Sequence, residues 1–318
     1  MPDVPVTRDM IEAAHARIAP HVRRTPVLGV VAGELGLPTG VTLKLELLQH
    51  TGSFKARGAF NRILSAAEWD EVPPVGLVAA SGGNHGAAVA YAARRLGYPA
   101  EIFVPSSSPA MKRDRIASFG AVVHVVDGLY DDAQVAAIEH QSASGALAVH
   151  PFEHPHVIAG QGTMSLELGQ QLPDGFDTIV VATGGGGFIA GQAAWSRGRH
   201  RVVSVEPESS RCLQAALAAG WPTPVPVSGV AADSLGARQI GDVAWAIVEQ
   251  FVDHAVVVSD DDIRGAQRAL WDELRLVVEP GGAAALAALR SGAYVPEPDE
   301  RVVVVVCGSN ADPDSIIR

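Results

Sequence analysis

The chain of 318 residues lacks the features that mark several specialised classes of protein. It has two cysteines, Cys212 and Cys307, too few for a disulfide framework or a cysteine-based zinc site, and this favours a reducing, cytoplasmic compartment. No apolar run approaches the roughly 20 residues that cross a bilayer, and the N-terminus has no signal-peptide pattern. The net charge is −11 and no Lys/Arg run exceeds a pair, so nucleic-acid and membrane partners are not expected.

What the sequence does contain is an alternation of short apolar runs with alanine-rich segments of helical length. Apolar strands separated by helices predict parallel sheets that are buried on both faces. The fold class is therefore α/β, with two doubly wound domains of mostly parallel sheet. The predicted strands are 41–47, 75–81, 100–105, 121–126, 146–150, 177–183, 201–207, 254–259 and 301–307, and helices are predicted at 84–97, 109–120 and 130–143.

One lysine stands in an unusual setting, in the stretch TGSFKARGAF (51–60). Lys55 follows Phe54 and is otherwise framed by small residues. It is either a solvated surface lysine, the common case, or a lysine in a dry pocket whose lowered pKa makes the amine a nucleophile. The stretch by itself leaves both interpretations open.

The first glycine-containing loop, ASGGNHG (80–86), follows a predicted strand and opens a predicted helix. A helix N-terminus preceded by glycines presents free N–H groups that suit a carboxylate or a phosphate. Asn84 and His85 would contact a ligand there or cap the helix. The alternative is an ordinary turn with an asparagine N-cap.

The second loop, TGGGGFIAG (183–191), lies between a predicted strand and a predicted helix. Four successive glycines are entropically costly, and such a loop suits a backbone that wraps closely around a phosphate. Gly185, Gly187 and Ala190 also fit the dinucleotide pattern G-x-G-x-x-A, with Glu206 ending the next strand. An NAD-dependent oxidoreductase is therefore an alternative, although it leaves the other motifs unexplained.

The third loop, VVCGSNADP (305–313), follows a strand of valines. Ligands of open α/β sheets bind beyond the carboxyl ends of the strands. The strand ends at Ser81, Thr183 and Cys307 are thus expected to converge on one cleft. Cys307 is either an inert core thiol or part of that cleft. The segment 221–234, rich in proline and small residues, is predicted to be a loop near it.

Together these motifs resemble those of the fold-type II pyridoxal-phosphate enzymes, in particular serine and threonine dehydratases and serine racemases. SFKARGAF is similar to their cofactor-lysine motif, SGGNHG to their substrate-carboxylate loop and GGGG to their phosphate cup. Residues 154–172 resemble the helix before the phosphate strand, and EPGGAAALAAL (279–289) and CGSN (307–310) complete the set. The order and spacing match over nearly the whole chain.

The resemblance implies a tryptophan synthase β-like architecture, with a large cofactor-binding domain of residues 1–70 and 152–318 and a small domain of residues 71–151. It implies pyridoxal 5'-phosphate held by Lys55 as a Schiff base, beside Phe54. Asn84 would bond its phenolic oxygen, and Cys307 would face its pyridine nitrogen. A homodimer is expected by analogy. The implied backbone contacts are Gly184, Gly185, Gly186 and Gly187 for the phosphate, and Ser81, Gly82, Gly83, Asn84 and His85 for the substrate carboxylate.

The activity implied by the resemblance is that of a dehydratase (ammonia-lyase), which removes water and ammonia from a 3-hydroxy amino acid such as L-threonine or L-serine and yields a 2-oxo acid. Lys55 would remove the Cα proton as general base. A neutral thiol at Cys307 does not force protonation of the pyridine nitrogen, which favours β-elimination.

Two alternatives within the family are a serine racemase and a 3-hydroxyaspartate dehydratase. Racemases carry their second acid/base, a serine, at the position of Gly82, which here has no side chain. The acidic stretch 128–137 disfavours a dicarboxylate substrate, whereas Arg238 either contacts a carboxylate or lies on the surface. Glu206 matches one ligand of the racemase metal site, but Cys212 replaces the aspartate. We therefore expect no metal and interpret Glu206 as a solvated carboxylate.

Overall fold

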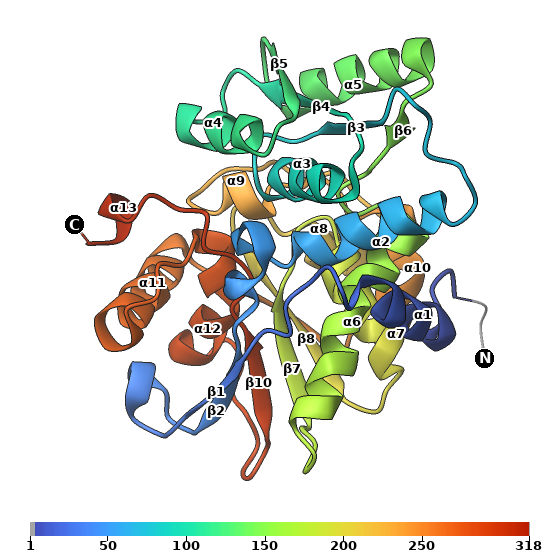
Figure 1. Ribbon diagram of the computed structural model, residues 1–318. Helices are drawn as coiled ribbons and strands as arrows, with labels where there is room; N and C mark the ends of the chain where they lie inside the picture. Colours follow the sequence, from blue (N-terminus) through green and yellow to red (C-terminus); the bar gives the residue numbers. More distant parts are fainter. Residues whose placement is uncertain (1–3, 318) are drawn as a thin grey trace.

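The structure, a computed structural model, describes residues 4–317 and contains two separate sheets flanked by helices (Figure 1). The six-stranded sheet has the order β1-β2-β10-β7-β8-β9, and the four-stranded sheet has the order β5-β4-β3-β6. Neighbouring strands are parallel except for the antiparallel pair β1–β2, so the predicted α/β class is confirmed. The strands are β1 (Val27–Val30), β2 (Val41–Lys44), β3 (Leu77–Ala80), β4 (Ala100–Pro105), β5 (Val122–Val126), β6 (Leu147–Ala148), β7 (Thr178–Ala182), β8 (Arg201–Pro207), β9 (His254–Val258) and β10 (Val302–Val305).

Helices follow most strands and cover both faces of the sheets. All nine predicted strands are present, although those at 41–47, 75–81, 146–150 and 301–307 are each three residues shorter than predicted, and β1 was not predicted. The predicted loop 221–234 ends early, because α9 begins at Ala232. The helices are α1 (Arg8–Ile18), α2 (Lys55–Ala67), α3 (Asn84–Leu96), α4 (Ala110–Ser118), α5 (Tyr130–Ser144), α6 (Pro155–Gln171), α7 (Gly187–Ser196), α8 (Cys212–Ala219), α9 (Ala232–Leu235), α10 (Asp242–Phe251), α11 (Asp260–Leu274), α12 (Pro280–Ser291) and α13 (Asp314–Ile317), with short 3₁₀ turns η1 (Glu34–Gly36), η2 (Glu46–Leu48) and η3 (His50–Gly52).

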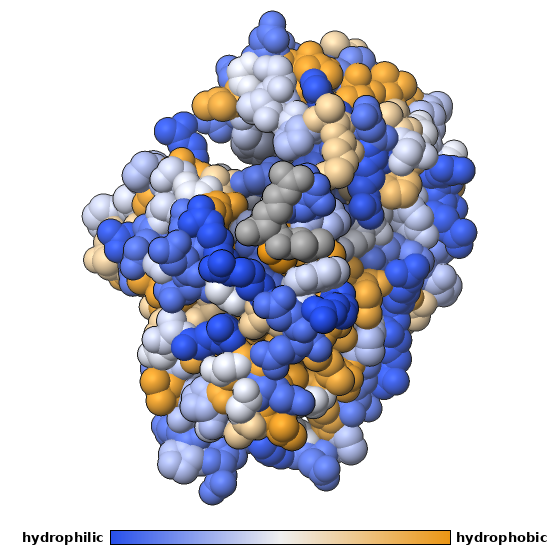
Figure 2. Space-filling view, turned by 90° about the vertical axis from the view of Figure 1, so that its left-hand side faces the viewer, coloured by the Kyte–Doolittle hydropathy of each residue, from blue (hydrophilic) through white to orange (hydrophobic). Residues whose placement is uncertain are grey.

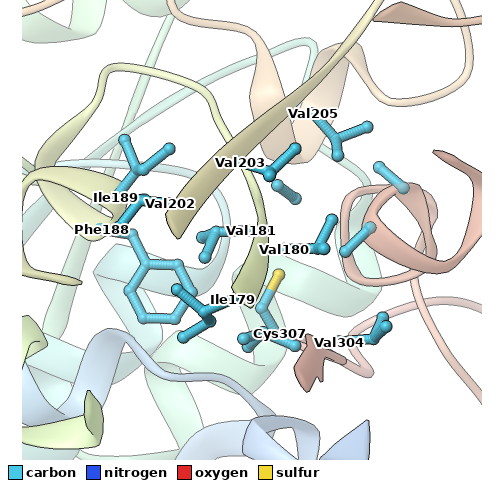
Figure 3. Close-up of a cluster of buried hydrophobic side chains, with 14 of the residues drawn as sticks. Ile179, Val180, Val181, Phe188, Ile189, Val202, Val203, Val205, Val304 and Cys307 are labelled. Atoms are coloured by element: carbon cyan, nitrogen blue, oxygen red, sulfur yellow. The ribbon is translucent and has the colours of Figure 1, made fainter. Parts of the chain in front are cut away.

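The centre of the six-stranded sheet is dry (Figure 3). Val180, Val203 and Val304 on three adjacent strands are completely buried. β-Branched side chains suit a pleated surface, and each such burial stabilises the fold by roughly 1.5–3 kcal/mol. Cys307 lies in the same cluster, two residues beyond the end of β10. This rigid sheet places the β7 and β10 strand ends beside each other.

The four-stranded sheet is built from residues between 77 and 148 alone, whereas the other sheet uses segments on both sides of it. Its outer end is less well covered: apolar side chains gather at the end of the molecule that carries β5 and α5 (Figure 2). Val122 and Val125 of the edge strand and Val135 of α5 are more than half exposed. Among residues 4–317, no helix is long and apolar enough to cross a membrane.

The exact domain boundaries and the homodimer stay predictions.

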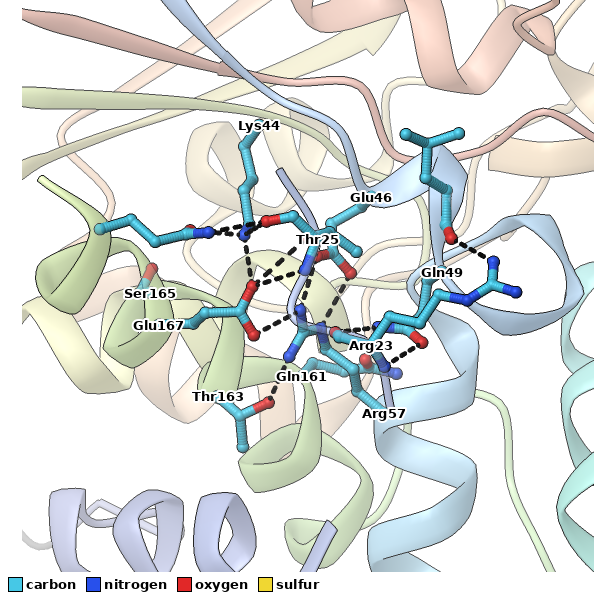
Figure 4. Close-up of polar contacts among 12 residues, drawn as sticks. Arg23, Thr25, Lys44, Glu46, Gln49, Arg57, Gln161, Thr163, Ser165 and Glu167 are labelled. Atoms are coloured by element: carbon cyan, nitrogen blue, oxygen red, sulfur yellow. Dashed lines mark hydrogen bonds and ion pairs between the residues drawn. The ribbon is translucent and has the colours of Figure 1, made fainter. Parts of the chain in front are cut away.

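A buried ionic network joins the six-stranded sheet to α2 and α6 (Figure 4). Arg57 donates to both oxygens of Glu46, at 2.8 and 2.7 Å, and to Glu167 at 3.0 Å. Lys44 donates to the other oxygen of Glu167 at 2.5 Å and to the carbonyl of Thr25 at 2.8 Å. These four charged side chains are at most 2% exposed. Buried charges need such complete pairing, and here the pairing fixes the first turn of α2 against α6.

Candidate active site

Lys55 is the first residue of α2 and directly follows Phe54, whose N–H donates to the carbonyl of Cys307 just beyond the end of β10. Its Nζ donates to the carbonyl oxygen of Pro151 at 2.8 Å and lies 5.2 Å from the centre of the Phe54 ring. Burial lowers the pKa of Lys55 to about 8, although Cys307 and Glu279 oppose the shift. Lys55 is therefore not a freely solvated lysine, because a neutral carbonyl is its hydrogen-bond partner and its neutral form is favoured.

The loop between β3 and α3, together with the first two residues of α3, holds the five residues expected to bind a carboxylate. The N-cap of α3 is Gly83, with no side-chain cap, so the alternative of an asparagine N-cap was wrong. The N–H of Ser81 donates to Phe103 at 2.9 Å, and its hydroxyl accepts from Gly83 at 3.2 Å. In the part of the chain that the structure describes, no hydrogen bond uses the N–H of Gly82, Asn84 or His85. Those three donors are available to an anion.

The imidazole of His85 does not take part in that donor set. Its Nε2 bonds the carbonyl oxygen of Val149 at 2.7 Å, and the residue is 4% exposed. Burial lowers the pKa of His85 to about 3, helped by the nearby charge of Lys55. The ring is thus neutral at physiological pH and fastens α3 to the chain after β6.

Asn84 lies at the centre of a short polar chain. Its amide nitrogen donates to Glu279 at 2.6 Å, and its oxygen accepts from the amide of Asn310 at 2.5 Å. Glu279 is 3% exposed, and burial raises its pKa to about 7. These hydrogen bonds connect the start of α3 to the segment after β10 and to the residue before α12. The ends of β3 and β10 therefore lie close together, as predicted.

The glycine loop after β7 has a row of unused donors. Among residues 4–317, no hydrogen bond uses the N–H of Gly184, Gly185, Gly186 or Gly187. Side chains have no room here: a Cβ on Gly185 would lie 2.6 Å from the Phe152 ring. Gly186 has φ +87°, which glycine adopts without strain. The loop therefore presents bare backbone N–H groups at the N-terminus of α7, which attract an anion.

Cys307 and Phe54 connect the remaining elements. The N–H of Phe54 donates to the carbonyl of Cys307 at 3.2 Å, and the Phe54 ring stacks on Phe188 of α7 with centroids 3.8 Å apart. The thiol of Cys307 is 3.5 Å from the carbonyl oxygen of Gly281. Burial raises its pKa, so the thiol stays neutral. The lysine, the glycine loop and the end of β10 thus share one region.

The structure also tests the predictions made for Glu206 and Arg238. Glu206 is buried, with 0% exposure, and accepts from the N–H groups of Leu213 and Gln214 at 2.8 Å each, so its interpretation as a solvated carboxylate was wrong. Burial raises its pKa to about 7. Arg238 is a surface arginine that pairs with Asp131 at 3.0 Å. No group of three His, Cys, Asp or Glu side chains within residues 4–317 is arranged to hold a metal, and the expected absence of a metal stays a prediction.

Sequence reasoning gave no role to Glu279, Asn310 or Pro151, although all three contact predicted site residues. Glu279 and Asn310 lie in the motifs EPGG and CGSN, so their motifs were noticed but not their contacts. Pro151 contributes a backbone carbonyl, which no residue type reveals.

Comparison with known proteins agrees with this geometry. A family profile described as "Pyridoxal-phosphate dependent enzyme" matches residues 18–308. The chain is 36% identical to a serine racemase of Oryza sativa subsp. indica, over 95% of this chain and 90% of that protein. It is also 36% identical to an L-threonine ammonia-lyase of Thermotoga maritima, over 98% of this chain and 78% of that one. The solved structure of maize serine racemase superposes with a TM-score of 0.90 at 34% identity, covering 98% of this chain and 96% of that chain.

The residues present fit pyridoxal phosphate. The four glycines provide unpaired N–H groups for its phosphate, and Lys55 has an amine of lowered pKa with no carboxylate bound to it. Cys307 offers a neutral thiol in the same region. The chain belongs to the family of pyridoxal-phosphate dependent enzymes, as its motifs predicted.

Proposed function

We propose that this enzyme is an ammonia-lyase that removes water and ammonia from a 3-hydroxy amino acid such as L-threonine or L-serine and releases a 2-oxo acid. The relatives include both serine racemases and threonine ammonia-lyases, so family membership alone does not choose between them. The choice rests on Gly82.

Gly82 leaves one face of the substrate without an acid/base at the position where racemases carry a serine. A Cβ on Gly82 would lie 1.8 Å from the hydroxyl oxygen of Ser108 and 3.0 Å from a methyl of Val104, so the space is already filled. Racemisation requires a proton to leave one face of Cα and return to the other. Without a serine at position 82 to return the proton, elimination of the β-hydroxyl is the favoured outcome.

Lys55 supplies the base on the other face. Pyridoxal phosphate, when bound, supplies an electron-withdrawing ring that makes the Cα proton of an attached amino acid removable. The Lys55 amine has a pKa of about 8, so a useful fraction is neutral near pH 7 and accepts that proton. Its hydrogen bond to the neutral Pro151 carbonyl orients the amine without holding it in the protonated form, as a carboxylate would.

The other residues bind and orient. The N–H groups of Gly82, Asn84 and His85 hold the substrate carboxylate, and those of Gly184 to Gly187 hold the cofactor phosphate. Asn84, kept in place by Glu279 and Asn310, would bond the phenolic oxygen of the cofactor. Phe54 would pack beside its ring, and the neutral Cys307 thiol would serve as the partner of its pyridine nitrogen.

The test is an assay of ammonia and 2-oxo acid release with added pyridoxal phosphate. The substrates are L-threonine, L- and D-serine, threo-3-hydroxyaspartate and 3-phenylserine, and the Lys55→Ala variant is the control. Equal amounts of ammonia and 2-oxo acid from L-threonine or L-serine support the proposal. Conversion of L- to D-serine that outpaces ammonia release, measured by chiral chromatography, would replace it with a racemase.

A further inference from the structure

A crevice of about 460 Å³ opens between the second half of α2 and the chain that connects α5, β6 and α6. Its polar lining comes from Arg62, Glu71, Gln141, His150 and His154. None of these residues belongs to the site described above. Arg62 lies seven residues beyond Lys55 on α2, about 10 Å along the helix axis. The crevice is therefore a separate feature from the substrate site.

The guanidinium group of Arg62 has an unpaired hydrogen-bond donor. Its Nε is buried and has no hydrogen-bond partner within the described part of the chain. Burial lowers the pKa of Arg62, and only the charge of Glu71 opposes that shift. A buried donor without an acceptor is destabilising, and more so when the group is charged. Arg62 lines the crevice, so an oxygen-bearing anion there would be an acceptor for its guanidinium group.

Two histidines add donors to the same crevice. The Nδ1 of His150 accepts from the N–H of Glu153 at 2.8 Å, and the Nδ1 of His154 accepts from the N–H of His156 at 3.1 Å. Burial lowers the pKa of each ring to about 4, so both are neutral near pH 7. Because Nδ1 accepts, we assign the ring proton to Nε2, which has no partner among the hydrogen bonds of the described residues.

We propose that this crevice binds a small oxyanion, a carboxylate or a phosphate, between the guanidinium of Arg62 and the Nε2–H groups of His150 and His154. Charge-assisted hydrogen bonds from arginine to such oxygens are the strong class of these interactions. Glu71 is the opposing group in the lining, and its negative charge weakens the binding.

An anion bound in the crevice would contact His150, which is next to the residue that accepts the hydrogen bond of Lys55. His150 directly precedes Pro151, whose carbonyl accepts the hydrogen bond of Lys55. His150 and Lys55 are also close enough for the charge of Lys55 to lower the pKa of His150. Occupation of the crevice is thus coupled to Lys55 through two consecutive residues.

The test is isothermal titration calorimetry of the holoenzyme, whose phosphate loop is filled by the cofactor. The probes are sodium phosphate and sodium propionate in a buffer free of other oxyanions. Arg62→Met is expected to weaken binding at least tenfold, whereas Glu71→Gln is expected to tighten it several-fold by removing repulsion. Arg264→Met removes a surface arginine of α11 and should change nothing.

The two probes separate the sources of the anion. Binding of one probe alone identifies a phosphate-bearing or a carboxylate-bearing ligand, and either result supports the proposal if Arg62→Met weakens that binding at least tenfold. Propionate bound at the β3–α3 loop would not respond to the change at Arg62. Heat that is unchanged in both Arg62→Met and Glu71→Gln, or no heat with either probe, overturns the proposal. Because no turnover is measured, this result is independent of the proposed lyase activity.

Discussion

Two lysines of this protein, Lys44 and Lys55, have different hydrogen-bond partners. Lys44 is fully buried and donates to Glu167, Gln171 and the carbonyl of Thr25, all within 2.8 Å. Lys55 donates to one carbonyl oxygen, that of Pro151. Burial lowers the pKa of both; Glu46 and Glu167 oppose this shift at Lys44, and Cys307 and Glu279 oppose it at Lys55, but only Lys44 is hydrogen-bonded to a carboxylate.

The difference shows how a fold decides whether a lysine is structural or reactive. Carboxylates next to a buried ammonium stabilise its charged form, so the amine keeps its proton and has no free electron pair. A lysine with one neutral acceptor loses that proton more easily and becomes a base or a nucleophile. The predictions below test this contrast.

The largest expected effect comes from Lys55→Ala. General-base catalysis contributes about 10²–10⁴-fold, so kcat should fall by about 10³-fold or more. The same change removes one hydrogen bond and no ion pair, so the melting temperature should shift by only a few degrees. Steady-state kinetics and thermal unfolding on one preparation check both. Residual activity above a tenth of wild type would mean that another group is the base.

Lys44→Met is expected to show the reverse pattern. Removing one partner of a buried ion pair costs about 3–5 kcal/mol, and Glu167 keeps only Arg57 as a cationic partner. The free energy of unfolding, measured in urea, should fall by about 3 kcal/mol, while kcat per folded molecule stays within twofold. A large loss of kcat in fully folded Lys44→Met would erase the distinction between the two lysines.

The pH dependence of amine labelling sharpens the contrast further. A pKa lowered to about 8 means that Lys55 is protonated below that pH and nucleophilic above it, whereas an ordinary lysine needs a pH near 10.4. In cofactor-free enzyme, labelling of Lys55 by an amine-reactive reagent should rise through about pH 8, as read by mass spectrometry. Lys44 should remain unlabelled in the folded protein. Equal labelling rates at the two positions at pH 8 would contradict the assignment.

The sequence predicted what depends on local pattern. The apolar runs, the glycine loops and their order predicted the α/β class, most of the strands and the convergence of the loops on one cleft. The contrast between Lys44 and Lys55 was not predictable, because the partners of Lys44 come from residues 25, 167 and 171, which only the fold brings together.

The same limit explains the errors. Glu206 ends a strand and looks solvated in the sequence, but α8 begins shortly after it and points two N–H groups at the carboxylate. Asn84 has the residue type of an N-cap, yet Gly83 holds that position and frees the amide for Glu279 and Asn310. In both cases, tertiary contacts outweighed local propensity.

The smallest expected effect on kcat is that of Glu279→Gln. This substitution tests whether the protonation of Glu279, in addition to that of Lys55, affects the pH dependence of the reaction. Burial raises the pKa of Glu279 to about 7, so its charge changes near neutral pH beside Asn84. Glutamine imitates the protonated form and keeps an oxygen for the Asn84 amide, so kcat should change by less than about tenfold. The limb of the kcat–pH profile near pH 7 should vanish, and the one set by Lys55 near pH 8 should remain.

The melting temperature of Glu279→Gln at different pH values tests independently whether Glu279 titrates near pH 7. A carboxyl whose folded pKa is raised holds its proton more tightly in the folded state, so wild-type stability falls as the pH rises from about 4.5 toward 7. Glu279→Gln has no such proton to lose and should melt at a higher temperature than wild type above pH 7, but not at pH 4. If the limb near pH 7 persists and the melting temperatures stay equal at both pH values, Glu279 does not titrate in that range. Of Lys55 and Glu279, Lys55 alone would then control the reaction through its protonation state.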